Sequence, residues 1–513
     1  MAQPLPLKPA DMPKVGMVDE CYQSYNVEML EVTGGKYWRP YGPALEAALR
    51  QPAPAPAASS GDTPAGMNPA LYEYRPPIDL TNPRLRKLAA ALGPAYVRVS
   101  GTWANTTYFP ETEQAPATPP AGFMGVLTQQ LWKGVIDFAK AVDAEIVTSF
   151  ATGQGTSDAA GVWTADLAKR WLAFTCAAGG RIAAAEWMNE PTLAAMGGVP
   201  QGYDAAAYGR DFEIFHAFAR QAAPDMLILG PGSVGESTGD WAVAAGYGSD
   251  VLLKARDLMA AIRPTHVDGF SYHHYGAVSR RCISTGRWTQ TTPEAALTED
   301  WLGRTDQTLA FYRQVRDEFE PGKPFWLTET ADAACGGNPW ANTFLDTFRY
   351  LDQLGRLANQ DVRVVAHNTL VASDYGLLND KTLEPKPNYW AALLWRRLMG
   401  PTVLEAGVPI HEGAHVYAHC LRGTPGGILV LAINNSRTQP SALDIPKAAD
   451  GYTLTAPQLE SARVRLNGQE LRLGAQDEFP DLQGSHIPAG RVEIAPASIA
   501  FLAVPEAGNA ACS

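Results

Sequence analysis

The chain carries little charge and no cluster of positive charge. Only 18% of its 513 residues are charged, and 41 Lys and Arg stand against 53 Asp and Glu, so that the formal net charge is −12. Nucleic acids and anionic membranes are bound through clustered Lys and Arg, and we therefore expect neither as a partner. No apolar run approaches the roughly 18 residues of a membrane-spanning helix. The hydrophobic content of 46% is that of a globular chain.

Cysteines are also scarce. The chain has 6, none of them in a Cys-x-x-Cys pair, so that neither a zinc site nor a thioredoxin-type motif is expected. They are too few for a disulfide scaffold. One or two disulfides remain open, and the spacing does not pair the candidates Cys21, Cys176, Cys282, Cys335, Cys420 and Cys512.

No signal peptide is visible. The segment MAQPLPLKPADMPKV at the start lacks a basic stretch followed by an apolar one. Because Met1 could equally stand before a mature, exported sequence, the compartment stays open, and we favour a periplasmic or secreted location.

Short apolar runs alternate with amphipathic stretches between Lys14 and Met399. Continuous apolar runs are typical of strands buried on both faces. We expect such strands at Lys14–Asp19, Ala95–Ser100, Glu145–Phe150, Ala183–Asn189, Met226–Gly230, Val267–Tyr275, Pro324–Thr328 and Asp361–Ala366. The three- and four-residue spacing of apolar residues predicts helices at Asn82–Ala91, Leu127–Val142, Thr164–Ala178, Asp204–Ala222, Val251–Ile262, Arg304–Phe319, Ala341–Leu357 and Asn388–Met399.

This alternation predicts an α/β fold, a (β/α)8 TIM barrel over residues 14–400. A doubly wound sheet is the alternative. It would need a glycine-rich phosphate loop after the first strand, and Asp19–Asn26 contains no glycine. From residue 401 to 513 the apolar runs are short and separated by Pro, Gly, Asn and Asp, which predicts an appended antiparallel β-sandwich. A strand from residues 1–13 could join it.

Two long insertions interrupt the barrel pattern after its first and second strands. Both would lie at the C-terminal face of a barrel, where its chemistry takes place. Gln51–Gly66 is rich in Pro, Ala and Ser, and we interpret it as a tolerated surface loop. Ala104–Gly125 carries four prolines and only acidic charges, and we interpret it as a rigid wall at the mouth of the barrel.

Two glutamates end apolar strands at the same face. Glu190 follows the fourth predicted strand in AEWMNEP, and Glu329 follows the seventh in PFWLTET. A carboxylate at the end of a buried strand is costly unless function requires it. Strands four and seven face each other across a barrel, and about 5 Å between their carboxylates would suit a retaining glycosidase.

Several segments, in chain order, resemble clan A glycoside hydrolases and, within that clan, family 79, the heparanase and β-glucuronidase group. They are Arg84–Leu88, Pro94–Thr102, Asn189–Pro191, Tyr272–Tyr275, Glu329–Thr330, Gly336–Gly337, Asp374–Leu378 and Pro387–Trp390. Their joint order is more specific than any one of them. The first 80 residues and the C-terminal part match only in general architecture.

The resemblance implies roles for two catalytic residues and two of their neighbours. Glu190 is the expected acid/base, which needs a raised pKa, and Glu329 is the expected nucleophile, held ionised by hydrogen bonds. Asn189 resembles the residue that grips the sugar 2-hydroxyl. Tyr275 resembles a tyrosine that hydrogen-bonds the nucleophile, with a core aromatic as its alternative role.

The resemblance also implies a site for a uronate carboxylate. Gly336 and Gly337 would bind it through their amides, together with the Tyr375 hydroxyl. Thr102 and Asn105, just after the second strand, complete the expected substrate-binding set.

The roles of two histidines stay open, and two further residues are expected to be structural. For His273 and for His274, a catalytic role and a structural role are equally compatible with the sequence. Glu186 lies four residues before Glu190, deeper in the barrel, and we expect it to be structural. Cys335 is also expected to be structural, and a disulfide to Cys282 is one possibility.

The sequence therefore predicts a retaining β-glucuronidase that removes terminal glucuronic acid from glycans or glycoconjugates. A heparanase-like endo-β-glucuronidase is one alternative, which the absence of a basic cluster and the loop Ala104–Gly125 disfavour. A non-catalytic carbohydrate-binding protein is the other. We expect a glucuronic-acid-containing carbohydrate as substrate, and neither a metal nor another cofactor, since no residue spacing resembles a ligand set.

Overall fold

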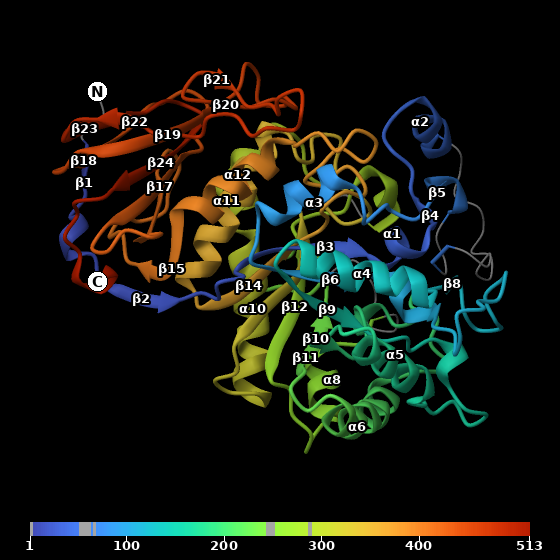
Figure 1. Cartoon of the computed structure of the whole chain (residues 1–513). Helices are drawn as coiled ribbons and strands as arrows, with labels where there is room; N and C mark the ends of the chain where they lie inside the picture. The colour runs from blue at the N-terminus through green and yellow to red at the C-terminus, as the bar shows by residue number, and fades with distance from the viewer. Residues whose placement is uncertain (1–3, 51–62, 65–67, 243–251, 286–289) are drawn as a thin grey trace.

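The computed structural model describes residues 4–50, 63–64, 68–242, 252–285 and 290–513. In this part of the chain, eight parallel strands close into a barrel (Figure 1). In chain order they are β3 (Gln23–Glu28), β6 (Ala95–Ser100), β9 (Ala144–Ser149), β10 (Ile182–Glu186), β11 (Leu227–Ser233), β12 (Gly269–Tyr275), β13 (Phe325–Ala331) and β14 (Val362–His367). The barrel closes where β14 pairs with β3. The predicted TIM barrel is confirmed.

Helices surround the barrel at the positions that the apolar spacing predicts. They are α3 (Pro83–Ala90), α4 (Gln129–Ala141), α5 (Asp166–Ala177), α6 (Ala205–Ala222), α8 (Ala255–Ala261), α10 (Arg304–Phe319), α11 (Phe344–Asn359) and α12 (Pro387–Leu398). The side chains of Asn82, Thr128 and Asp204 accept hydrogen bonds from backbone amides in the first turns of α3, α4 and α6. Such N-caps fix where a helix begins. No helix in the described ranges has the length and apolarity needed to cross a bilayer.

The prediction that Lys14–Asp19 is the first barrel strand is wrong, and the barrel starts later than residue 14. Lys14–Met17 forms β2, which pairs antiparallel with β15 (Met399–Leu404) at the edge of a different sheet. Its Val15 and Met17 are exposed, as edge positions allow. The true first strand, β3, reads QSYNVE and is buried throughout. Its polar residues, Gln23, Ser24, Asn26 and Glu28, break the continuous apolar run that is typical of a strand buried on both faces.

Two further sheets pack into a sandwich that, among the described strands, is antiparallel apart from one strand pair, the first strand of the chain with β18 (Ser441–Ile445). One sheet has the order β2, β15, β16 (His415–Leu421), β17 (Ile428–Asn434), β24 (Ser498–Val504), β19 (Ala449–Thr455), β20 (Arg465–Leu466) and β21 (Gln469–Glu470), and β22 (Ser485–Ile487) pairs with β19. The other sheet joins β1 (Leu5–Pro6), β18 (Ser441–Ile445) and β23 (Gly490–Ile494). An apolar core that includes Val430, Leu443 and Leu502 lies between the two sheets.

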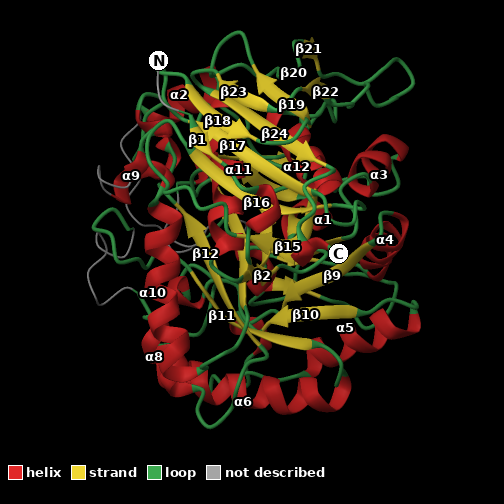
Figure 2. Cartoon of the chain, turned by 90° about the vertical axis from the view of Figure 1, so that its left-hand side faces the viewer, coloured by secondary structure: helices red, strands yellow, loops and turns green. Residues whose placement is uncertain are grey.

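Helices α11 and α12 connect the sandwich to the barrel. Both helices are buried along almost their whole length, because the sandwich covers the side that a barrel helix normally exposes to solvent. Figure 2 shows the sandwich strands gathered above the barrel strands, with α11 and α12 at the level where the two parts meet.

An additional substructure lies between β3 and α3, and the sequence analysis did not foresee it. It contains α1 (Met29–Thr33), β4 (Gly35–Trp38), α2 (Pro43–Leu49) and β5 (Tyr72–Arg75), and β4 pairs antiparallel with β5. Trp38 stacks on Tyr72 with their ring centroids 4.6 Å apart. Of the predicted insertion Gln51–Gly66, only residues 63 and 64 are among the described residues.

Candidate active site

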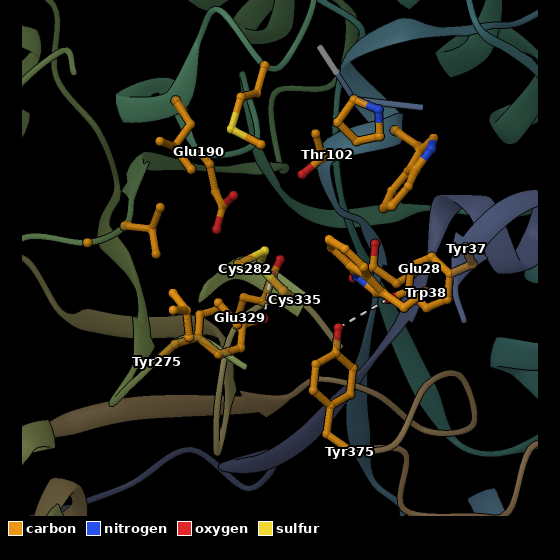
Figure 3. Close-up of a pocket in the computed structure, with 18 of the residues that line it drawn as sticks. Glu28, Tyr37, Trp38, Thr102, Glu190, Tyr275, Cys282, Glu329, Cys335 and Tyr375 are labelled. Atoms are coloured by element: carbon orange, nitrogen blue, oxygen red, sulfur yellow. Dashed lines mark hydrogen bonds between the residues drawn. A yellow bond between two sulfur atoms is a disulfide. The ribbon is translucent and has the colours of Figure 1, made fainter. Parts of the chain in front are cut away.

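A cavity of about 220 Å³ lies at the C-terminal ends of the barrel strands. Figure 3 shows it open between side chains that come from several different strand-to-helix connections. Its described lining combines carboxylates with aromatic and aliphatic side chains: Glu28, Tyr37, Trp38, Pro64, Tyr72, Thr102, Trp103, Glu190, Leu193, Met196, Val234, Gly235, Leu252, Tyr275, Val278, Cys282, Glu329, Ala334, Cys335 and Tyr375.

Glu190 and Glu329 both line this cavity, as the sequence predicts. Glu329 is part of β13, whereas Glu190 follows the end of β10 and has a φ of 47°. A left-handed conformation costs a residue with a β-carbon roughly 1 kcal/mol and is concentrated at functional sites. One carboxylate oxygen of Glu190 and one of Glu329 lie within 4.8 Å of each other. The two carboxylates therefore flank a space that a glycosidic bond can occupy.

Arg98 of β6 forms the charged floor of the site. Its guanidinium donates to Glu329 Oε2 and to Glu186 Oε2, each at 2.8 Å, and to Asn189 Oδ1 at 2.8 Å. Burial raises the pKa of Glu186, but the charge of Arg98 outweighs it and holds that pKa well below its usual range. A buried ion pair keeps its charges only with such complete pairing. Glu186 thus holds Arg98 in place beneath the cavity, consistent with the structural role expected for it.

His273 and Glu190 form the second charged pair. His273 Nδ1 lies 3.1 Å from Glu190 Oε1. Burial lowers the pKa of His273, but the carboxylates of Glu329, Glu186 and Glu190 more than offset this and raise it to about 9. Burial raises the pKa of Glu190, and the charge of Glu329 adds to the effect. Glu190 is therefore suited to hold a proton before it gives that proton to a leaving group.

Strand alternation separates the two histidines whose roles were open. His274 faces away from the site and contacts Thr308 Oγ1 at 2.9 Å, and burial lowers its pKa to about 3. Only His273 reaches the carboxylates, because neighbouring residues of a strand point to opposite faces.

Tyr275 donates a hydrogen bond to the nucleophile candidate, as predicted, at 2.7 Å from Glu329 Oε1. Asn368, at the end of β14, continues this network. Its Nδ2 lies 3.0 Å from Glu28 Oε1, 3.0 Å from the Tyr275 hydroxyl and 3.1 Å from the Tyr375 hydroxyl. The sequence analysis did not identify Asn368.

Glu28, at the end of β3, is a third carboxylate in the cavity that the sequence analysis missed. Burial raises its pKa well above the usual range, and the nearby Glu329 adds to this. Its Oε2 has no hydrogen-bond partner among the described residues. A buried polar atom without a partner, in a cavity, is a natural contact for a substrate hydroxyl. A correct assignment of the first strand would have revealed it, since Glu28 is the last residue of that strand.

The glycine pair lies directly behind the cavity wall. Cys335, Gly336 and Gly337 have φ values of 63°, 82° and 86°. A β-carbon on Gly336 would come within 2.8 Å of Trp38, which explains why glycine is needed there. The neighbouring Ala334, Cys335 and Tyr375 line the cavity, whereas the two glycines do not.

Arg281 fixes this turn from behind, and the sequence analysis did not identify it either. Its buried guanidinium donates to the Cys335 carbonyl at 3.1 Å and to the Gly337 carbonyl at 3.0 Å, and it pairs with Asp374. It also lies over the ring of Tyr41, 4.2 Å from the centroid. A disulfide between Cys282 and Cys335, the pairing considered from the sequence, joins the loop after β12 to the loop after β13.

The remaining predicted binding residues differ in position. Thr102 lines the cavity. Asn189 accepts hydrogen bonds at Oδ1 from Arg98 and Ser100, which leaves its Nδ2 as the donor for a ligand. Asn105 is buried behind Asn189 and holds it through hydrogen bonds to its backbone amide and carbonyl. The expectation that Asn105 itself binds substrate therefore finds no support in its contacts.

The interpretation of the two insertions needs correction. No residue of Ala104–Gly125 lines the cavity, so that loop is not its wall. Pro64, from the insertion interpreted as a tolerated surface loop, does line it, together with Tyr37, Trp38 and Tyr72 of the same strand-to-helix connection. The length and proline content of a loop do not reveal the direction in which it folds back.

Glu190, His273 and Glu329 form the cluster of described residues whose geometry could hold a metal ion, with ligand atoms within 4.8 Å of one another. The guanidinium of Arg98 already neutralises Glu329, and His273 Nδ1 already contacts Glu190. This charge arrangement suits proton transfer and covalent chemistry at an acetal carbon better than cation binding.

No protein-family model matches the chain. Heparanase-like protein 1 of Arabidopsis thaliana is 26% identical over 85% of this chain and 86% of its own. Heparanase of Mus musculus is 31% identical over 60% of this chain and 57% of its own. Among solved structures, a 4-O-α-L-rhamnosyl-β-D-glucuronidase from Fusarium oxysporum is 12% identical, covers 98% of this chain and 100% of its own, and superposes with a TM-score of 0.62, which shows a shared fold.

Proposed function

Because this chain is a heparanase- and glucuronidase-like glycoside hydrolase of family 79 in clan A, we propose that it is a retaining β-glucuronidase that removes terminal glucuronic acid from glycans or glycoconjugates. The observation that carries the proposal is the pair Glu190 and Glu329. Their carboxylate oxygens approach within 4.8 Å, which agrees with the roughly 5 Å separation of retaining enzymes.

The two carboxylates have environments that suit two different roles. Glu190 gives its proton to the glycosidic oxygen while Glu329 attacks the anomeric carbon, which forms a covalent glycosyl-enzyme and releases the leaving group. Glu190 then takes a proton from water, and the resulting hydroxide displaces Glu329 from the sugar. Arg98 and Tyr275 hold the two oxygens of Glu329 in place for the attack.

Recognition of the uronate carboxylate is assigned to the wall around Tyr375. The hydroxyl of Tyr375 lines the cavity, and the turn at Gly336 and Gly337 lies directly behind it. Arg281 supports this turn by donating to its carbonyl groups, while its charge is paired with Asp374. A carboxylate bound there would meet the hydroxyl of Tyr375 as a donor.

Cleavage from the chain end is favoured by the size and walls of the cavity. About 220 Å³ corresponds to room for about seven water molecules at about 30 Å³ each, the scale of a single sugar ring. The aromatic side chains of Tyr37, Trp38, Tyr72 and Trp103 are part of its walls. Two disulfides support an exported location, since oxidising compartments are where they persist.

The test is hydrolysis of p-nitrophenyl β-glucuronide compared with the matching β-glucoside and β-xyloside. We expect clear preference for the glucuronide, and proton NMR of the first product should show the β-anomer. On a glucuronate-terminated oligosaccharide, free glucuronic acid should appear first. Early internal fragments from heparan sulfate would instead show an endo-acting enzyme, and absence of hydrolysis of every glycoside would overturn the catalytic proposal.

A further inference from the structure

A second cavity, of about 450 Å³, adjoins the active site on the far side of the two-stranded β4–β5 sheet. It is formed by α1, β5, the segment that follows β5, and the segment between β14 and α12, and its described lining includes Glu31, Tyr74, Arg75, Pro77, Asp380 and Lys381. Among the described residues, Tyr37 is the only one that lines both this cavity and the catalytic one. The side chain of Tyr37 is thus the partition between the two spaces.

Tyr37 closes the catalytic cavity at the end away from the reacting carboxylates. Figure 3 shows Tyr37 on the opposite side of the cavity from Glu190. The Tyr37 hydroxyl lies 3.2 Å from the Tyr375 hydroxyl, and the Tyr37 ring packs against Trp103 with centroids 5.2 Å apart. These contacts hold the ring in one position, and only 1% of its surface is exposed.

The position of Tyr37 matches one particular atom of a bound glucuronate. The anomeric carbon must lie between Glu190 and Glu329, and C4 lies across the pyranose ring from the anomeric carbon. The C4 hydroxyl therefore points toward the end of the cavity that Tyr37 closes. A further sugar on this hydroxyl would have to occupy the space of the tyrosine ring.

We propose that Tyr37 is the specificity-determining residue that excludes glucuronides substituted on the C4 hydroxyl, and that its removal joins the second cavity to the active site. This inference rests on the proposed function. Once joined, the second cavity gives a 4-O-linked sugar a place to bind.

The second cavity has the chemistry that a neutral sugar needs. Lys381 supplies a donor and Asp380 an acceptor, whereas Arg75 already pairs with Asp380 and both carboxylate oxygens of Glu31 already accept backbone amides. Arg75 Nε is buried and has no hydrogen-bond partner among the described residues. Tyr74 and several prolines provide apolar surface. Mixed polar and apolar linings of this kind are typical of small-ligand sites.

The experiment compares two substrates, p-nitrophenyl β-D-glucuronide and its 4-O-α-L-rhamnosyl derivative, in four proteins. They are the wild type, Tyr37→Ala, Tyr37→Phe and the control Tyr452→Ala, which truncates a tyrosine of β19 that lines neither cavity. The readout is the ratio of kcat/KM for the substituted to the unsubstituted glucuronide. We expect Tyr37→Ala to raise this ratio by at least about ten-fold, because a change of a few carbon atoms in a binding pocket changes kcat/KM by about ten-fold or more. Tyr37→Phe keeps the ring and should keep the wild-type ratio, as should Tyr452→Ala.

The outcomes separate this inference from the proposed function. If the wild type cleaves both substrates equally, or if folded Tyr37→Ala shows an unchanged ratio, the inference is overturned. If the wild type cleaves neither, the proposed function fails first. Should Tyr37→Ala not fold, Tyr37→Val replaces it. Should Tyr37→Ala be inactive, the two glycosides can be compared by binding. Titration calorimetry with Tyr37→Ala in a Glu329→Gln background then gives the ratio of their affinities in place of the ratio of kcat/KM.

Discussion

At the scale of single residues, the site depends on how buried charges neutralise one another. Arg98 is one cation shared by Glu186 and Glu329, and all three side chains are almost completely buried. Removing one member of such a group leaves an unpaired buried charge, which costs about 3–5 kcal/mol. The ion-pair group around Arg98 is therefore rigid. Glu190 differs from Glu329 because it contacts His273 and not Arg98.

We predict that Glu190→Gln and Glu329→Gln each reduce turnover of an unactivated glucuronide by at least about 10²–10⁴-fold. Both side chains line a cavity, so that the fold should survive the substitutions. With an activated aryl glucuronide, azide should restore activity to the Glu190 variant, because that leaving group needs no proton. Steady-state kinetics and a thermal melt of each variant check this. A variant with near wild-type turnover would show the assignment to be wrong.

The catalytic glutamates could be predicted from the sequence because a carboxylate that ends an apolar run is anomalous. Arg98 shows the same anomaly in Val97-Arg98-Val99, but an arginine has many roles and the sequence does not reveal which carboxylates it will meet. Glu28 and Asn368 gave no such signal. Their role comes from the closure of the barrel, which brings residues 28 and 368 within 3.0 Å.

At the scale of elements, the regular parts of the fold could be predicted and the connections could not. Ala95–Ser100 and Arg304–Phe319 have the predicted bounds because their apolar periods are clear and their ends are marked. The β4–β5 sheet has no such pattern, since its strands have four residues each and mix aromatic with charged side chains. The two strands are held in place by packing against the mouth of the barrel.

The loop after β12 positions the turn at Gly336, and Arg281 is the residue that does this. We predict that Arg281→Lys raises KM for p-nitrophenyl β-glucuronide about ten-fold with little change in kcat, because a loss of binding shared by ground and transition states affects KM. Lysine cannot reproduce the several directed donors of a guanidinium. The matched control is Arg280→Lys, at an exposed arginine that pairs with Glu46. A fall in kcat at constant KM would contradict a positioning role.

The two disulfides should have separable effects. They close loops of 53 and 92 residues, and each should stabilise the fold by about 2–4 kcal/mol. Cys282→Ser with Cys335→Ser should also raise KM, because both residues line the cavity. Cys420→Ser with Cys512→Ser, in the sandwich, should lower stability alone. Urea unfolding and KM of the two double variants test this, and an unchanged KM in the first would show that the loop keeps its shape without the bridge.

At the scale of the whole molecule, the barrel and the sandwich share a buried charge network. His415 of β16 contacts Asp352 of α11 and Glu299 of α9 (Glu299–Leu302) through its two ring nitrogens. The other charged or titratable groups that face this network are Arg356, Asp306 and Tyr417. No local pattern predicts such a contact, because the residues are more than 60 positions apart and belong to different parts of the fold.

We predict that this junction loses stability as pH rises. Burial lowers the pKa of His415, but Asp352 and Glu299 raise it from 6.5 to about 9. Because the pKa of His415 is higher in the folded than in the unfolded state, the protonated imidazole stabilises the fold fully below pH 6.5. This stabilisation is lost as the pH rises through 9, and the shift corresponds to at most about 3 kcal/mol. His273 has a pKa of about 9 as well, so the wild type alone cannot separate the two contributions.

The variant His415→Gln separates them. At pH 6 it should be less stable than the wild type by an amount approaching about 3 kcal/mol, whereas at pH 10 the two should converge, because neither then carries the charge. The part of the pH dependence that the variant retains belongs to other groups, among them His273 and the buried carboxyl groups of Glu31, Glu236 and Asp332, whose pKa values burial raises to about 7. Urea unfolding of both proteins across this range measures the difference. If the gap stays constant with pH, His415 contributes through packing alone and the charge of the imidazole does not hold the sandwich to the barrel.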